Sequence, residues 1–175
     1  MNPPNPSDPP RLSGQAIIEA LKRTRVEFIL SVPDICTSAA MLRPISEDPG
    51  LRLVRVCKED EGVSICAALS FCERRGVLLM QQTGLMDSLN ALRAIGVDYH
   101  NPVCMMIGLL GKEPDLAPAQ SRSFGVRVIQ PILDVMGIRH MVLNSDADID
   151  AGMLAIDAAY QRSEPLALLL GRNPS

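Results

Sequence analysis

Short apolar runs alternate with amphipathic segments along most of the chain, and this alternation leaves few folds open to it. The apolar runs predict six strands, at residues 26–32, 51–56, 76–81, 102–110, 138–143 and 166–170. The segments between them predict a helix capped by Ser13 and further helices at residues 34–45, 60–74, 85–95, 128–136 and 149–162. Strands and helices that alternate in this way form a mostly parallel six-stranded sheet with helices on both faces. We therefore expect an α/β fold.

The bulk composition indicates one globular domain. A chain of 175 residues, 47% of them hydrophobic, is long enough to bury a substantial core. The net charge of -3 argues against nucleic acid as a main partner, because phosphate binding requires a basic surface. Residues 1–10 include five prolines and predict a disordered tail. The expected domain spans residues 11–175.

The sequence also predicts a cytoplasmic protein with no membrane contact. No stretch approaches the roughly 20 apolar residues that span a bilayer. Residues 1–10 lack the charged and apolar regions of a signal peptide. The five cysteines form no Cys-x-x-Cys pair, so we interpret them as small buried apolar side chains in a reducing compartment. Their spacing predicts no metal site in this chain.

Three consecutive acids, Glu59, Asp60 and Glu61, lie between the second predicted strand and the helix that follows it. Such a junction lies at the carboxyl edge of a parallel sheet, where open α/β folds bind ligands. Acids at the start of a helix also complement its positive end, which is a purely structural alternative. If Glu61 instead handles a proton, it should be buried and its pKa should be raised.

The junction after the third predicted strand has the same layout and is rich in polar side chains. Residues 81–90 include Gln81, Gln82, Asp87 and Asn90. The structural alternative is a simple turn from a strand into a helix. Buried polar groups need hydrogen-bond partners, however, and a ligand between the two junctions would supply them.

Four segments of the chain resemble one enzyme family, in the same order. Residues 59–69 (Glu-Asp-Glu-Gly-Val-Ser-Ile-Cys-Ala-Ala-Leu) resemble the segment around the activating glutamate of thiamine-diphosphate enzymes, most closely that of sulfopyruvate and phosphonopyruvate decarboxylases. Residues 80–90 look like that family's Met-Gln-Asn-Ser-Gly-Leu-Gly-Asn-Ser-hydrophobic-Asn motif. Residues 31–34 resemble its first-strand turn, and residues 118–120 match a Pro-Ala-Gln element. The resemblance covers residues 12–170.

The resemblance implies the pyrimidine-binding half of the thiamine-diphosphate fold. It also implies decarboxylation of a 3-substituted 2-oxoacid, sulfopyruvate- or phosphonopyruvate-like, to an aldehyde and CO₂. Glu61 stands at the position of the catalytic glutamate, which hydrogen-bonds a ring nitrogen of the cofactor. The other site residues implied are Thr83, Gly84 and Leu85 for the cofactor, and Pro33, Asp34, Gln82 and Asp87 for the substrate.

The resemblance further implies a partner subunit. Single-chain relatives carry a Gly-Asp-Gly motif that holds Mg²⁺ and the diphosphate, and this sequence contains no such motif. The diphosphate and Mg²⁺ are therefore expected on a second chain, with the crevice between the two chains of a homo- or hetero-oligomer.

Several positions depart from the family pattern. Gln82 and Thr83 replace Asn and Ser, and Met86 and Asp87 replace Gly and Asn. The added carboxylate of Asp87 is expected to repel an anionic substrate. Two alternatives therefore stay open: a related lyase or transferase for another 2-oxoacid, and a non-catalytic scaffold subunit.

The remaining titratable candidates are two histidines and two arginines. We expect His100 and His140 to be structural. Arg122 and Arg127 lie in and just after a long loop at residues 111–125. They either meet an anionic substrate or are solvated loop charges.

Overall fold

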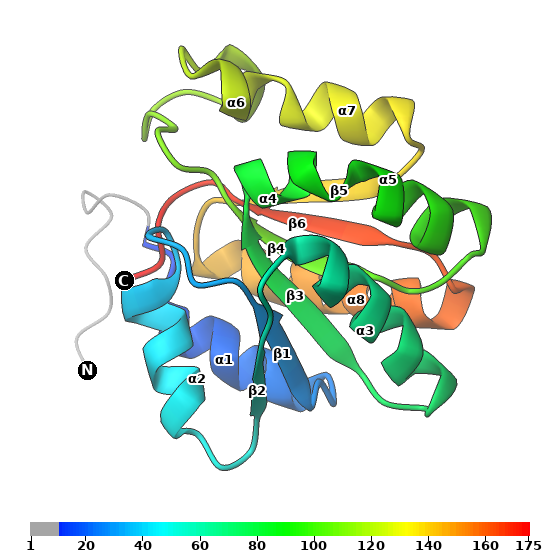
Figure 1. The fold of residues 1–175 in the computed structure, drawn as a ribbon. Helices are drawn as coiled ribbons and strands as arrows, with labels where there is room; N and C mark the ends of the chain where they lie inside the picture. Colours follow the sequence, from blue (N-terminus) through cyan, green and yellow to red (C-terminus); the bar gives the residue numbers. More distant parts are fainter. Residues whose placement is uncertain (1–10) are drawn as a thin grey trace.

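The computed structural model describes residues 11–175 as one six-stranded sheet with helices on both sides (Figure 1). Every strand pairs in parallel with its neighbours, and the strand order is β2-β1-β3-β4-β6-β5. The strands are β1 (Phe28–Ser31), β2 (Arg52–Arg55), β3 (Gly76–Gln81), β4 (Cys104–Gly108), β5 (Arg139–Leu143) and β6 (Leu166–Leu170). The predicted α/β fold class is confirmed. The tail predicted at residues 1–10 lies outside the described residues.

The helices form one layer on each face of the sheet (Figure 1). One layer contains α1 (Gly14–Arg23), α2 (Arg43–Glu47) and α8 (Ile149–Arg162). The other contains α3 (Glu59–Phe71), α4 (Gln82–Asp87), α5 (Leu89–Ala91), α6 (Phe124–Arg127) and α7 (Ile129–Val135). Successive strand residues point to opposite faces, so Ile29 packs in the first layer and Leu30 in the second. Because the sheet is buried on both faces, nearly every position of its central strands is apolar.

Two of the predicted helices differ from the observed ones. The helix expected at residues 34–45 is a turn followed by a π-helical segment, Ser38–Leu42, and then by α2. Pro44, near the end of the predicted helix, lies in the first turn of α2. A missing N–H costs little at that position, so the helix continues to Glu47.

The helix expected at residues 85–95 begins earlier and is interrupted. It starts at Gln82 as α4, breaks at Ser88, and continues as α5 and a π-helical segment, Leu92–Asp98. The Ser88 hydroxyl donates to the Gly84 carbonyl at 2.8 Å. This bond to the preceding turn accompanies the break in the helix.

The long loop at residues 111–125 is internally bonded. The Glu113 carboxylate accepts hydrogen bonds from the Ser121 hydroxyl (2.8 Å) and the Arg122 backbone N–H (3.1 Å). The bond from Ser121 is the main reason that the pKa of Glu113 is lowered. Both Arg122 and Arg127 are exposed, but the guanidinium group of Arg127 also donates to the Ser121 carbonyl at 2.9 Å.

The cysteines and histidines differ in exposure. Cys36, Cys66 and Cys104 are buried as predicted, but Cys57 and Cys72 are exposed because each lies beside an end of α3. His140 is half-buried on β5, with Nδ1 3.2 Å from the Ile138 carbonyl oxygen. His100 is exposed and precedes β4, which places it at the amino edge of the sheet. None of the helices in residues 11–175 is long and apolar enough to cross a membrane.

Candidate active site

The carboxyl edge of the sheet brings the two predicted junctions close together. β2 leads into α3, which carries Glu61, and β3 leads into α4, which carries Thr83. Only β1 separates these strands in the sheet. Because neighbouring strands lie about 4.8 Å apart, the ends of β2 and β3 are about 10 Å apart.

Glu61 lies in the first turn of α3 and folds back toward the strand before it. Its Oε2 accepts a hydrogen bond from the Cys57 backbone N–H at 2.9 Å. This bond fixes one carboxylate oxygen, and Oε1 has no hydrogen-bond partner within residues 11–175. The side chain is exposed, so this chain alone does not supply the burial expected of a proton-handling glutamate.

Gly62 explains why α3 can start so close to the sheet. An added Cβ at Gly62 would lie 2.5 Å from Cδ1 of Leu78, a fully buried residue of β3. The glycine therefore allows the first turn of the helix to rest directly on the strand. Glu61 is held at the edge of the sheet by this contact and by its bond to Cys57.

The two junctions also contact each other. The carboxylate of Glu59 lies against Gly84, where an added Cβ would be 2.2 Å from Glu59 Oε1. Lys58 Nζ lies 3.4 Å from the Asp87 carboxylate and 3.8 Å from that of Asp60. The hydrogen bond to Asp87, followed by the charge of Asp60, raises the pKa of Lys58. The negative charge of Asp87 is therefore offset locally, which weakens the repulsion expected for an anionic substrate.

The three residues expected at the cofactor differ in exposure. Thr83 is exposed, and its hydroxyl donates to Gln81 Oε1 at 3.0 Å. Gly84 is buried against Glu59, and Leu85 is fully buried in the core of the second layer. Of the three, only Thr83 presents a polar side chain to a ligand, because the Glu59 carboxylate occupies the space beside Gly84.

Two of the four residues expected at the substrate are engaged within the chain. The Asp34 carboxylate accepts from the backbone N–H groups of Cys36 (2.6 Å) and Thr37 (3.1 Å), and so holds the turn after β1. Gln82 is buried and exchanges two hydrogen bonds with the backbone of Leu110: its Nε2 donates at 2.9 Å and its Oε1 accepts at 2.8 Å. The structure therefore does not leave the Gln82 amide free for a substrate.

The other two, Pro33 and Asp87, are exposed at the carboxyl edge. A small cavity of about 270 Å³ lies beside Pro33, and its lining includes Arg43 and Arg55. This cavity lies where β1 and β2 end, next to the junction that carries Glu61.

Replacing Gln82 with Leu is expected to lower the free energy of unfolding by about 1–3 kcal/mol. The variant removes two neutral hydrogen bonds, each worth about 1 kcal/mol, and leaves backbone groups of Leu110 without a partner. Chemical denaturation measures the change. Gln161→Leu, at an exposed position of α8, serves as the control and should stay within about 0.5 kcal/mol of wild type. Equal stability of the two variants would show that the bonds to Leu110 contribute nothing.

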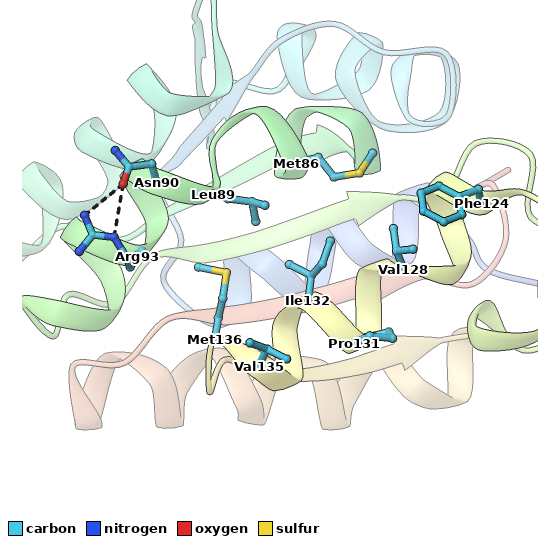
Figure 2. A pocket seen from close by; sticks show the side chains of 10 residues that line it. All are labelled: Met86, Leu89, Asn90, Arg93, Phe124, Val128, Pro131, Ile132, Val135 and Met136. Atoms are coloured by element: carbon cyan, nitrogen blue, oxygen red, sulfur yellow. Dashed lines mark hydrogen bonds between the residues drawn. The ribbon is translucent and has the colours of Figure 1, made fainter.

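The sequence did not indicate an apolar groove on the second helical layer. It lies between α4–α5 and α6–α7 and has a volume of about 690 Å³ (Figure 2). Met86 lines this groove together with Val128 and Ile132. The side chains of Phe124 and Val135 at its border are 69% and 90% exposed. Met86, which departs from the family pattern, therefore extends the apolar lining.

The fold and the two junctions define an open parallel α/β protein with a candidate ligand site at the carboxyl edge of its sheet. Sequence comparison with curated proteins identifies a family within this class. The chain is 30% identical over 159 residues to the sulfopyruvate decarboxylase subunit alpha of Methanothermobacter thermautotrophicus, covering 90% of this chain and 94% of that protein. It is 32% identical over 124 residues to the subunit alpha of Methanocaldococcus jannaschii, covering 70% and 71%. The chain belongs to the sulfopyruvate decarboxylase subunit alpha family.

Two further comparisons bear on architecture. A sulfopyruvate decarboxylase of Methanosarcina acetivorans is 26% identical over 86% of this chain, but the match spans only 38% of that longer protein. A solved 2-oxoglutarate:ferredoxin oxidoreductase from Magnetococcus marinus matches 97% of this chain and 30% of its own, with a TM-score of 0.62 and 13% identity. At that identity the likeness shows the fold alone. No family model matches the chain.

Proposed function

We propose that this chain is one subunit of a thiamine-diphosphate-dependent decarboxylase, in which Glu61 activates the cofactor. The substrate is a 3-substituted 2-oxoacid of the sulfopyruvate or phosphonopyruvate type, and the products are the aldehyde and CO₂. The observation that carries the proposal is the position of Glu61. Its carboxylate stands at the carboxyl edge of the sheet with one oxygen fixed by Cys57 and the other available to a ligand. The names of the family members support the reaction type.

The residues at this edge fit the pyrimidine end of thiamine diphosphate. Glu61 Oε1 is available to share a proton with a ring nitrogen, and exposed Thr83 lies at the neighbouring junction. Gly84 lets the carboxylate of Glu59 pack against the start of α4, which joins the two junctions at this edge. In residues 11–175 no group of three or more His, Cys, Asp or Glu side chains could hold a metal ion. We assign Mg²⁺ and the diphosphate to the partner subunit.

The protein's share of the chemistry is proton placement and orientation. When bound, thiamine diphosphate supplies the carbon nucleophile and accepts the electrons released with CO₂. Glu61 holds a proton at Oε1, and the Cys57 N–H keeps its other oxygen in place. Burial of Glu61 by the partner would raise its pKa, as its role requires. Pro33 and Asp87 border the space left for the substrate, where Lys58 offsets the charge of Asp87.

Reconstitution with the partner subunit tests the proposal. We expect the co-purified complex to release CO₂ and sulfoacetaldehyde from sulfopyruvate when thiamine diphosphate and Mg²⁺ are present, and the isolated chain to release neither. A panel with phosphonopyruvate and pyruvate identifies the preferred 3-substituent. Activity on another 2-oxoacid alone would support the related lyase or transferase. A complex that turns over none of them would leave the scaffold subunit as the better description.

A further inference from the structure

One buried polar atom within the described part of the chain has no partner. Nε of Arg172 is fully shielded from solvent and makes no hydrogen bond. Buried donors of this kind are rare in folded proteins, and each one calls for a physical explanation. A charged donor is the most costly group to leave unpaired, because burial removes its hydration without a replacement.

The backbone around Arg172 is held on both sides. The Gly171 N–H donates to the Leu143 carbonyl at 2.8 Å, which extends the pairing of β5 with β6. The Ser175 N–H donates to the Leu12 carbonyl at 3.0 Å. Arg172 therefore lies on a short segment fixed at both ends, at the carboxyl edge of the sheet.

A second cation, Lys112, follows the neighbouring strand at the same edge of the sheet. Lys112 follows β4, whose last residue, Gly108, is paired with Leu170 of β6. Burial, followed by the positive charge of Arg172, lowers the pKa of Lys112. The carboxylates of Glu113 and Asp115 act in the opposite direction but do not outweigh these effects. The Glu113 carboxylate is itself bonded to Ser121 and Arg122.

Lys112 is also held in position. Its backbone N–H donates to the Leu109 carbonyl at 3.2 Å, and its Nζ donates to the Glu113 carbonyl at 2.8 Å. No carboxylate of residues 11–175 forms a salt bridge with Lys112 or Arg172. Two cations that repel each other, and that form no salt bridge within residues 11–175, make a site complementary to an anion.

We propose that Lys112 and Arg172 form an anion subsite that binds the sulfonate or phosphonate group of the substrate. The inference rests on the proposed function and extends it, because it names the groups that recognise the 3-substituent. The subsite lies at the same sheet edge as the Thr83 junction. The ends of β3 and β6 are two strand spacings apart, about 10 Å, a gap that a three-carbon acid and two long cationic side chains can bridge.

Binding of sulfoacetate, a sulfonate that does not react, tests the subsite without requiring turnover. Calorimetric titration of the complex with its partner should give about 10–100-fold weaker binding for Arg172→Met and for Lys112→Met, since each removes one charged hydrogen-bond donor. Arg172→Lys and Lys112→Arg should recover part of the affinity. Arg162→Met is the matched control, because Arg162 is exposed at the end of α8, next to the amino edge of the sheet.

Kinetics and cofactor binding separate the possible outcomes. In the active complex, KM for sulfopyruvate should rise about 10–100-fold in both Met variants, while the affinity for thiamine diphosphate stays unchanged. Unchanged sulfoacetate binding in the folded Lys112→Met and Arg172→Met variants would overturn the subsite. Weaker binding of thiamine diphosphate in these variants, with sulfoacetate binding unchanged, would assign the two cations to the diphosphate. That result would also overturn the subsite. Failure of the proposed function gives a different result, because the wild-type complex would then release no CO₂ from sulfopyruvate. The sulfoacetate titration would still show whether Lys112 and Arg172 bind a sulfonate.

Discussion

Replacing Glu61 with Gln should lower kcat of the reconstituted enzyme by about 10²–10⁴-fold, the range for loss of a general acid–base group. Gln has nearly the same shape and keeps an oxygen that can accept the bond from the Cys57 N–H. It cannot exchange a proton with the cofactor ring. The melting temperature and the assembly with the partner should therefore stay close to wild type while the release of CO₂ nearly stops.

Asp60→Asn is the matched control for this variant. Asp60 stands in the same first turn of α3, so its change to Asn removes one negative charge from the same helix end. A charge effect on the helix would lower activity equally in both variants. We expect Asp60→Asn to stay within a few-fold of wild-type kcat. Near wild-type turnover of Glu61→Gln would refute the assignment of Glu61.

Replacing Gly62 with Ala should lower the free energy of unfolding by about 1–3 kcal/mol, the usual cost of overpacking. Alanine favours the helix by about 0.5–1 kcal/mol, but the new methyl group would lie 2.5 Å from the buried Leu78 side chain. The clash outweighs the gain in helix propensity, because the Leu78 side chain is fully buried and has no free space to move into. Relief of the clash pushes α3 away from the sheet, so kcat should fall along with stability.

A double-mutant cycle with Leu78→Val isolates this contact. Leu78→Val alone is destabilising, but it removes a methylene where the new methyl group needs room. The double variant should therefore be more stable than the sum of the single changes indicates, by about 0.5–3 kcal/mol in chemical denaturation. Gly125→Ala, where an added Cβ meets only Met86 at 3.8 Å, should not destabilise the chain. Simple additivity of Gly62→Ala and Leu78→Val would contradict the packing explanation.

The sequence predicted most accurately the elements whose two ends are marked along the chain. The bounds of β3, β6 and α8 agree with prediction: Pro165 and Gly171 flank β6, and polar residues flank β3 and α8. Prediction was poorest at residues 34–45 and 85–95. In the second segment, the bond from Ser88 to the preceding turn interrupts a pattern that looks like one helix.

The candidate site was predicted in part. The position of Glu61 at the strand-to-helix junction followed from the local pattern and the family resemblance, and the structure places it there. Its exposure did not follow, because the local pattern does not report how far a side chain at the start of a helix is covered. The engagement of Gln82 with Leu110 joins residues 28 positions apart, and no local pattern reports such a contact. The same holds for Lys112 and Arg172, which only the pairing of β4 with β6 brings together.

The strand order has a consequence for how the chain acquires its fold. Among residues 11–175, β5 pairs only with β6, and β6 comes later in the sequence, yet inserts between β4 and β5. During synthesis on the ribosome, β5 emerges with no strand to pair with until residues 166–170 follow. A nascent chain that stops before that point exposes two unpaired strand edges, and such edges promote aggregation. Completion of the sheet therefore awaits the final strand.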